Sequence, residues 1–447
     1  MRLEGRVLQK FNKTDTIELH TVGKIRVKLM ILTAGGRRAR ACGGHYIMKI
    51  LILSCGTGEG HNSAAKAVYD NLKGKNTECE IRDVLSFKSE RAAGRAAEVY
   101  AAVIKRAPLL FGAAYVLGGL YDRAGLPSPI YYSNAKYAEK LCGYIASNGF
   151  NCVICTHLFA MEAMTAVRRE WDCGVRVYGV LTDYTAIPFY KDCVLDGWFV
   201  PDGEAAGQLE KSGIPRRIIY RTGIPVREKF CAELTREGAR EALGLPKDKK
   251  IVAVAAGGAG CGRLLKLCKG LDKALDGDCV VAVFPARNKS LEAKLLKRFG
   301  GGNRFLIVGY TEAIHLYFKA ADVVMTKPGG LSSTEAAALR VPVIHLKAIP
   351  GCETANAKYF ARRGLAVRTR TVRSAVRAAE RLLADGDCTR NMLDLQRIFI
   401  NPRAAELITE KIEEEQNGRV ALDSVYCGGL ACGRDNVLQL CPEADNG

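Results

Sequence analysis

Residues 326–356 combine a glycine pair with well-spaced polar side chains that can do specific chemistry. Gly329 and Gly330 follow Lys327 and open a predicted helix, and glycine lets the backbone come close to a ligand. The free N–H groups at the start of a helix suit an anion such as a diphosphate. Glu335, five residues beyond Gly330, can then accept hydrogen bonds from the hydroxyls of a ribose.

Polar residues continue beyond that helix. Glu353 and Asn356 lie in a predicted loop after the apolar run 341–344, where they can hydrogen-bond the hydroxyls of a sugar. A glycine pair followed by Thr334 and Glu335, and then by these two residues, is hard to produce by packing needs alone. The stretch therefore predicts a nucleotide-sugar site.

Another glycine-rich turn, residues 256–260, follows a predicted strand and contains Gly258. Open α/β sheets bind ligands at such strand ends. The backbone N–H groups of this turn can face a phosphate, or the glycines can serve only a tight strand-to-helix turn. Both interpretations stay open.

His61 ends a third glycine-rich turn, residues 54–61, directly after the predicted strand Ile50–Leu53. The turn has a GxGxG pattern rather than the full dinucleotide fingerprint, so a redox cofactor is disfavoured. A neutral imidazole at this helix start can remove the proton of a hydroxyl that attacks a sugar carbon. His61 can also simply cap the helix; the sugar site in the second half of the chain favours the base.

The 447-residue chain carries a formal net charge of +19, although its 48% hydrophobic and 25% charged content is ordinary for a globular protein. Such a surplus attracts nucleic acid, an anionic membrane or phosphorylated substrates. Basic and aromatic residues are not interleaved in the way that stacks bases, so a nucleic-acid partner is disfavoured.

An apolar segment with basic ends spans residues 105–123. A segment of this kind can lie in a membrane interface beside anionic headgroups, and a buried core helix is the alternative. The basic surplus favours the membrane. The residues predicted to contact the membrane or the acceptor are Lys105, Arg106, Leu109, Phe111 and Leu117.

The 17 cysteines are spread along the chain without regular pairing, so we expect reduced thiols in a cytosol. Cys427, Cys432 and Cys441 form the densest group but have no CxxC pair and no neighbouring histidine, which disfavours a metal site. No apolar run reaches the ~18 residues of a spanning helix, and no secretory signal begins the chain. We expect a cytoplasmic protein that is peripheral on the cytoplasmic face of the membrane.

Short apolar runs alternate with segments of helical spacing, which predicts an α/β fold with parallel sheets. We expect two doubly wound, Rossmann-like domains that face a cleft. The predicted parts are a basic extension at 1–47 that we expect not to belong to the functional protein, a first domain at 48–225, a second domain at 226–403, and a helix with an irregular tail at 404–447.

Motifs in both halves resemble one known family. Residues 48–54 running into Gly58–His61, then 180–183, then 222–226, and finally 327–356 are similar to the monogalactosyldiacylglycerol synthase and processive diacylglycerol glucosyltransferase family. These enzymes have the GT-B fold and are relatives of the transferase that adds N-acetylglucosamine to the lipid-linked peptidoglycan precursor. The resemblance covers roughly residues 48–403.

The resemblance implies that 48–225 is the acceptor (lipid) domain and 226–403 the UDP-sugar-binding domain, and it implies a role for each matching residue. Gly329 and Gly330 contact the diphosphate of a UDP-sugar, Glu335 binds the ribose, and Glu353 with Asn356 faces the sugar. Tyr310 lies in the turn that contacts uracil, although a tyrosine there can equally be core. His61 takes the base position, and Asp183 orients the acceptor or supports the base. The full predicted UDP-binding set is Gly258, Tyr310, Lys327, Gly329, Gly330, Thr334 and Glu335.

The implied function is transfer of a hexose from a UDP-sugar to a membrane lipid such as diacylglycerol, with inversion and without a metal or other cofactor. Where the family commonly has a histidine after the Thr-Asp pair, this chain has Ile187. That departure weakens a two-histidine mechanism. The alternatives are N-acetylglucosamine transfer to an isoprenoid-linked acceptor, UDP-sugar epimerisation, and a non-catalytic UDP-sugar-binding relative.

Overall fold

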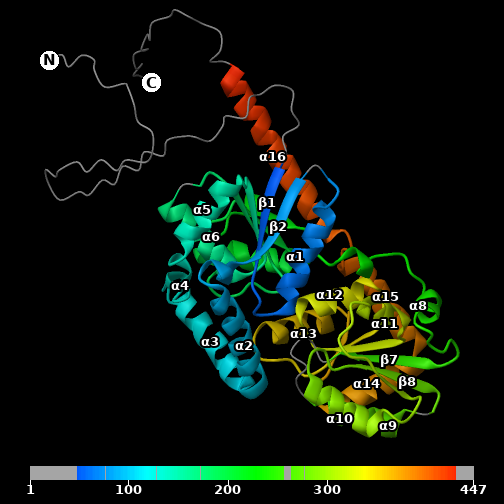
Figure 1. The fold of residues 1–447 in the computed structure, drawn as a ribbon. Helices are drawn as coiled ribbons and strands as arrows, with labels where there is room; N and C mark the ends of the chain where they lie inside the picture. Colours follow the sequence, from blue (N-terminus) through cyan, green and yellow to red (C-terminus); the bar gives the residue numbers. More distant parts are fainter. Residues whose placement is uncertain are drawn as a thin grey trace, which may run out of the picture. The chain divides into compact units, whose positions relative to one another are not determined.

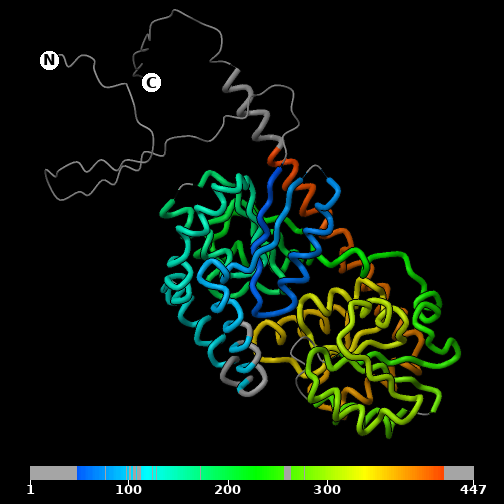
Figure 2. Tube along the Cα trace, viewed as in Figure 1, coloured from blue at the N-terminus to red at the C-terminus, as the bar shows by residue number. Residues whose placement is uncertain are grey.

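The structure is a computed structural model that describes residues 48–428 except 76, 127, 172, 256–262 and 276 (Figure 2). Within its helices, the side chains of residues 97, 100, 101, 104–106, 108–111, 123 and 417–428 also lie outside the description. The predictions for residues 1–47, Gly258, Cys432 and Cys441 therefore fall outside the described residues. So do the side chains of Lys105, Arg106, Leu109, Phe111 and Cys427.

The first domain is built on a six-stranded parallel sheet in the order β2-β1-β3-β4-β5-β6 (Figure 1). Alternate residues of its central strands enter two different cores: Leu51 and Leu53 join one, and Ile50 and Ile52 join the other. Both faces are covered, so the strand reads as a continuous apolar run. The strands are β1 (Met48–Ser54), β2 (Thr77–Asp83), β3 (Cys152–Cys155), β4 (Arg176–Val180), β5 (Gly197–Val200) and β6 (Ile219–Arg221).

A second six-stranded parallel sheet has the order β12-β11-β10-β7-β8-β9. Ile251 and Ala253 face one core and Val252 and Val254 the other, which repeats the two-sided burial of the first sheet. The strands are β7 (Lys250–Ala255), β8 (Cys279–Phe284), β9 (Phe305–Ile307), β10 (Val323–Thr326), β11 (Val343–His345) and β12 (Val367–Arg368). The predicted α/β fold with two Rossmann-like domains is confirmed.

Helices connect the parallel strands of both domains (Figure 1). Those before β7 are α1 (Glu59–Leu72), α2 (Glu90–Arg106), α3 (Pro108–Arg123), α4 (Tyr131–Ala135), α5 (Ala138–Asn148), α6 (Leu158–Glu170), α7 (Gly203–Lys211) and α8 (Arg236–Ala242). Those after β7 are α9 (Leu264–Ala274), α10 (Lys289–Phe299), α11 (Ile314–Ala320), α12 (Gly330–Ala338), α13 (Cys352–Arg362), α14 (Val372–Ala384), α15 (Gly386–Phe399) and α16 (Ala404–Gly428). None of the described helices is both long and apolar enough to cross a membrane.

The last helix, α16, packs against α1 of the first domain. Its Ile408 and Ile412 are fully buried in the core behind the first sheet. The hydroxyls of Tyr178 and Tyr220 donate to Glu415 of α16, at 2.7 and 2.5 Å. The end of the described chain therefore completes the domain that the beginning builds.

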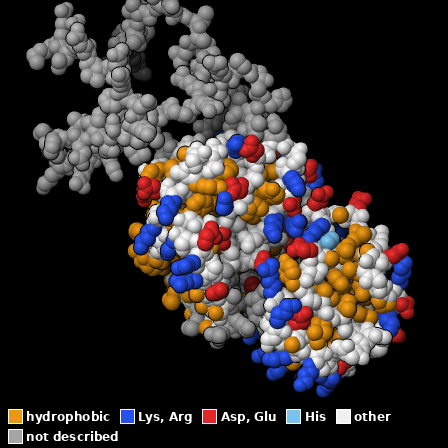
Figure 3. Space-filling model, viewed as in Figure 1, with side chains coloured by type: hydrophobic (Ala, Val, Ile, Leu, Met, Phe, Trp, Pro, Cys, Tyr) orange, Lys and Arg blue, Asp and Glu red, His pale blue; other side chains and the backbone are white. Residues whose placement is uncertain are grey.

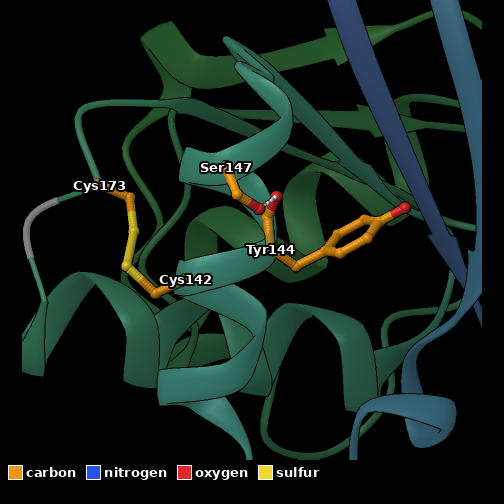
Figure 4. Close-up of a disulfide and its surroundings, with 4 residues drawn as sticks. All are labelled: Cys142, Tyr144, Ser147 and Cys173. Carbon is orange, nitrogen blue, oxygen red and sulfur yellow. Dashed lines mark hydrogen bonds between the residues drawn. A yellow bond between two sulfur atoms is a disulfide. The ribbon is translucent and has the colours of Figure 1, made fainter. Parts of the chain in front are cut away.

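One cysteine pair departs from the expectation of reduced thiols. Cys142 on α5 is bonded to Cys173, in the loop between α6 and β4 (Figure 4). The prediction is wrong for this pair because α5 packs on α6 and brings Cys142 next to that loop. Ten other described cysteines are not in a disulfide.

Candidate active site

Three helices begin at a glycine that lacks a side-chain cap: α1 after Gly58, α12 after Gly329 and α13 after Gly351. The first N–H groups of a helix have no partner within the helix. At the starts of α6 and α7, the side chains of His157 and Asp202 accept such bonds. The glycine starts leave these donors for a ligand, and the partial positive charge of a helix start favours an anion.

Gly330, the first residue of α12, lies directly against the segment that follows β4. A methyl group on Gly330 would overlap the carbonyl oxygen of Thr182 and lie 3.0 Å from the Cα of Asp183. Only glycine fits this approach. The helix that was predicted to hold the diphosphate therefore begins beside Asp183, which was predicted to serve the acceptor.

His61 is held by its Nδ1 atom. Nδ1 lies 2.9 Å from the carbonyl oxygen of Thr156 and 2.9 Å from Oγ1 of Thr182. Because a carbonyl oxygen only accepts, Nδ1 must carry the proton. The Nε2 atom of a neutral His61 then keeps its lone pair, as a general base requires.

The electrostatic surroundings keep His61 neutral. Burial lowers the pKa of His61 below its ordinary value, although the nearby carboxylate of Asp183 and the hydrogen bond to Thr156 raise it. A second imidazole, His157, lies with its ring centroid 4.5 Å from that of His61. Sequence reasoning missed His157, although it lies two residues beyond the end of β3, and strand ends were already the expected place for ligands.

Asp183 and Asn356 were predicted separately, and the structure brings them together. Nδ2 of Asn356 donates to Oδ1 of Asp183 at 2.7 Å and to the carbonyl oxygen of Pro328 at 3.1 Å. Oδ1 of Asn356 accepts from the backbone N–H of Tyr184 at 2.8 Å. Asn356 is fully buried, so in this arrangement its amide binds the first domain.

Glu335 is likewise paired across the two domains. The hydroxyl of Ser63, on α1, donates to Oε1 of Glu335 at 2.9 Å. Burial raises the pKa of Glu335 to about 7, against the lowering effects of the Ser63 hydrogen bond and of Lys229 and Arg227. Sequence reasoning missed Ser63, which lies two residues beyond His61.

Thr334 points away from solvent. Its hydroxyl donates to the carbonyl oxygen of Gly330 at 2.7 Å, and its Oγ1 lies 2.8 Å from the hydroxyl of Tyr184. Tyr184 also stacks on Tyr359, with ring centroids 4.4 Å apart. Thr334 thus holds the start of α12 against the first domain.

Glu353 and Asn356 lie on helix α13, so the prediction of a loop is wrong for them. Gly351, with φ of 112°, turns the chain directly before this helix. Oε2 of Glu353 accepts from the backbone N–H of Ile349 at 2.7 Å. Burial raises the pKa of Glu353, and the charge of Lys327 opposes that rise, so Lys327 lies near the predicted sugar site.

Tyr310 is 55% exposed, which removes the core alternative for this residue. Its hydroxyl donates to Oε1 of Glu312 at 2.8 Å. The guanidinium of Arg287 lies 4.4 Å from the centre of its ring. An exposed ring in the turn after β9 leaves that turn accessible to a flat base.

Helix α3 has one exposed apolar side and one packed side. Val116, Leu117 and Leu120 are 61, 64 and 54% exposed, so α3 is not a buried core helix. Figure 3 shows hydrophobic side chains among Lys and Arg on this part of the surface. On the packed side, a methyl group on Gly112 would overlap Pro350, and the ring of Tyr115 lies against Gly351.

Ile187, which replaces the family's histidine, is partly buried and packs against the core of the first domain. This side chain has no group that can exchange a proton. Within the described site, the imidazole of His61 lies near Asp183, and that of His157 lies beside His61.

Two Rossmann-like domains, with His61 at the strand ends of one and a glycine-started helix in the other, form the GT-B fold. Residues 61–226 match the family described as monogalactosyldiacylglycerol (MGDG) synthase, and residues 235–397 match glycosyl transferases group 1. The match of the first domain and the relatives described next confirm the predicted resemblance to the monogalactosyldiacylglycerol synthase and processive diacylglycerol glucosyltransferase family.

Similar proteins span almost the whole described chain. The processive diacylglycerol beta-glucosyltransferases of Bacillus thuringiensis (strain Al Hakam) and Bacillus cereus (strain AH187) are each 28% identical over 382 residues, which is 83% of this chain and 94% of the relative.

Solved structures share the fold. Acinetobacter baumannii MurG has a TM-score of 0.54 at 14% identity, covering 82% of this chain and 99% of that one. The Neisseria meningitidis UDP-GlcNAc 2-epimerase has a TM-score of 0.56 at 12% identity, covering 82% and 100%. Because transferases and epimerases both have this fold, the fold alone does not separate these activities.

Proposed function

We propose that this protein transfers a hexose from a UDP-sugar to a diacylglycerol-type membrane lipid, with inversion at the anomeric carbon. The observation that carries the proposal is the hydrogen bond from Nδ1 of His61 to Thr156, which leaves Nε2 of this residue as the proton acceptor, while the nearby charge of Asp183 raises its pKa against the effect of burial. The relatives named as processive diacylglycerol beta-glucosyltransferases support this acceptor class.

The chemistry is a direct displacement. The acceptor hydroxyl oxygen forms a bond to the anomeric carbon while the bond from that carbon to the UDP oxygen breaks. Nε2 of His61 takes the hydroxyl proton, and UDP leaves with the electron pair. The N–H groups at the start of α12 stabilise the negative charge that grows on the diphosphate.

UDP-sugar binding must exchange contacts between the domains for contacts to the donor. Oε1 of Glu335 accepts from Ser63 and Nδ2 of Asn356 donates to Asp183, so each of these atoms has a protein partner in this arrangement. The ribose hydroxyls replace Ser63 on Glu335, and the sugar hydroxyls replace Asp183 on Asn356. Release of Asp183 then leaves its carboxylate to orient the acceptor or to support His61.

The lipid acceptor reaches the site from a membrane on which the protein is peripheral. Val116, Leu117 and Leu120 on the exposed side of α3 enter the interface, and the basic surplus of the chain attracts anionic headgroups. The packed side of α3 touches Pro350 and Gly351, directly before α13 and its Glu353. A lipid held at α3 therefore lies near the proposed sugar subsite, on the cytoplasmic face.

The test is a screen of UDP-glucose, UDP-galactose and UDP-N-acetylglucosamine against diacylglycerol, glycosylated diacylglycerol and an isoprenoid-linked sugar, with products identified by mass spectrometry. We expect a hexosyl-diacylglycerol product that persists in EDTA and is lost in His61→Ala and Glu335→Ala. Conversion of the UDP-sugar without lipid would instead identify an epimerase. Loss of activity in EDTA with recovery in Mn²⁺ would refute metal-independent transfer.

A further inference from the structure

His157 presents a fixed ring to the proposed base. Its ring plane is 85° from that of His61, with the centroids 4.5 Å apart. Nδ1 of His157 accepts from the backbone N–H of Phe159 at 3.1 Å, which caps α6. Nε2 lies 3.0 Å from Oγ1 of Thr57. Because Nδ1 accepts, the proton of the neutral ring is on Nε2, which donates to Thr57.

Both nitrogens of His157 are therefore engaged. Protonation at Nδ1 would replace the acceptor of the Phe159 N–H with a second donor, so the ring resists a positive charge. The hydroxyl of Thr57 donates in turn to Sγ of Cys55 at 3.5 Å, which ties His157 to the glycine-rich turn that precedes His61. The ring is fixed on two sides and faces His61 on a third.

We propose that His157 is a positioning residue for the transfer reaction: its fixed, neutral ring holds the imidazole of His61 with Nε2 toward the acceptor and shields one side of that imidazole from water. The inference rests on the proposed role of His61 as the base. The titratable groups that face His61 are His157, at the start of α6, and Asp183, after β4.

The electrostatics agree with this geometry. Burial lowers the pKa of His157 well below its ordinary value, and the neighbouring His61 lowers it further. Burial also lowers the pKa of His61, whereas Asp183 raises it. Removing the ring of His157 would admit water to His61 and weaken the burial effect, so the pKa of His61 would rise.

Two variants of the full-length protein separate positioning from folding. His157→Asn keeps an oxygen that can cap α6 but removes the ring, and asparagine is a favoured cap. His157→Phe keeps a ring against His61 but removes both hydrogen bonds. The measurements are kcat and kcat/KM for lipid glycosylation as a function of pH, the titration of the His61 ring by NMR, and the thermal midpoint.

We expect kcat of His157→Asn to fall about tenfold, which is less than the roughly 100-fold or more that loss of the proton-transferring group itself costs. The acid limb of its kcat/KM profile and the NMR titration of His61 should move up by about half a pH unit or more as hydration returns. His157→Phe should keep the acid limb of the native protein and show a lower thermal midpoint.

A native pH profile and native kcat in His157→Asn would overturn the positioning role. Equal shifts of the acid limb in His157→Asn and His157→Phe would overturn it too. These results would leave the proposed function intact as long as His61→Ala stays inactive. Full turnover by His61→Ala would overturn the base and the role of His157 together.

Discussion

Single residues set the protonation state of this site. The most important of these residues is His61, whose Nδ1 donates to a backbone carbonyl and whose pKa is lowered by burial. The proton of an attacking hydroxyl needs an acceptor that is neutral at the working pH. The position of His61 at the start of α1 could be inferred from the sequence. The hydrogen bond that selects its tautomer could not, because its partner, Thr156, is 95 positions away.

The dependence of kcat/KM on pH should show the protonation of His61. Protonated His61 cannot accept a proton, so kcat/KM should fall on the acid side, and the lowered pKa places this limb below the ordinary value of 6.5. His61→Ala should lose at least about 100-fold in kcat. Its affinity for UDP, measured by calorimetry, should be unchanged because His61 is not a donor ligand. An acid limb above pH 6.5 would contradict this assignment.

A second residue-scale prediction concerns stability. Glu162 is 1% exposed and accepts from Asn134 at 2.7 Å, and burial raises its pKa to about 7. A carboxyl whose pKa is raised in the folded state gives a stability that is fully present below its unfolded pKa, near 4.5, and is lost as pH rises through 7. Ionisation above pH 7 should cost roughly 3 kcal/mol at most.

Glu162→Gln should therefore raise the thermal midpoint relative to the native protein above pH 7 and have little effect near pH 4.5. Differential scanning calorimetry across this pH range measures the difference. A constant difference between the two proteins at all pH values would show that Glu162 does not change its ionisation on folding.

At the scale of elements, the glycine starts of α1, α12 and α13 shape the site. Sequence reasoning located two of them, the turns before α1 and α12, because glycine clusters after apolar runs are visible. It placed Glu353 and Asn356 in a loop because the single Gly351 does not stand out in the sequence. It also missed β2, whose residues are half exposed on the edge of the first sheet, so no apolar run marks it.

Gly330→Ala should disable the enzyme without unfolding it. The added methyl would overlap Thr182, so α12 could not approach Asp183. We expect kcat/KM to fall about 100-fold, because a small misplacement of the reacting groups has an effect of this size. Gly386→Ala is the matched control. Gly386 is also the first residue of its helix, α15, and its added methyl meets nothing within 4 Å. Equal activity in the two variants would refute the close approach.

The exposed apolar side of helix α3 predicts an effect on membrane binding. Leu117→Gln with Leu120→Gln should weaken binding to anionic vesicles about tenfold or more, because two large apolar side chains no longer enter the interface. Ile398→Gln replaces an exposed apolar residue of α15 and should bind as the native protein does. Vesicle co-sedimentation measures all three. Unchanged binding by a folded double variant would remove α3 from the membrane contact.

At the scale of the whole molecule, the two domains satisfy each other's polar groups. Ser63 pairs with Glu335, Asp183 with Asn356, and Tyr184 with Thr334. The sequence predicted which residues of the second domain serve the donor, because their motif is local. It could not predict their partners, since each pair joins residues more than 100 positions apart.

These pairs predict that Ser63 competes with the donor. Ser63→Ala leaves the partly buried Glu335 without its hydroxyl partner when the domains are in contact, at a cost of about 1 kcal/mol, so the affinity for UDP should rise about fivefold. Ser63→Thr keeps a hydroxyl and is the control. Isothermal titration of UDP distinguishes the two. A weaker affinity in Ser63→Ala would mean that Ser63 itself holds the donor.

Helix α16 also sets an order of folding during synthesis. Residues 48–221 leave the ribosome before the second domain does. The core behind their sheet nevertheless lacks Ile408 and Ile412, and Tyr178 and Tyr220 lack Glu415, until almost the whole described chain has been made. The second domain, from 250 to 368, has all of its strands long before then. The domain that begins the chain is thus finished last, and truncation within α16 would harm the domain farthest from it in sequence.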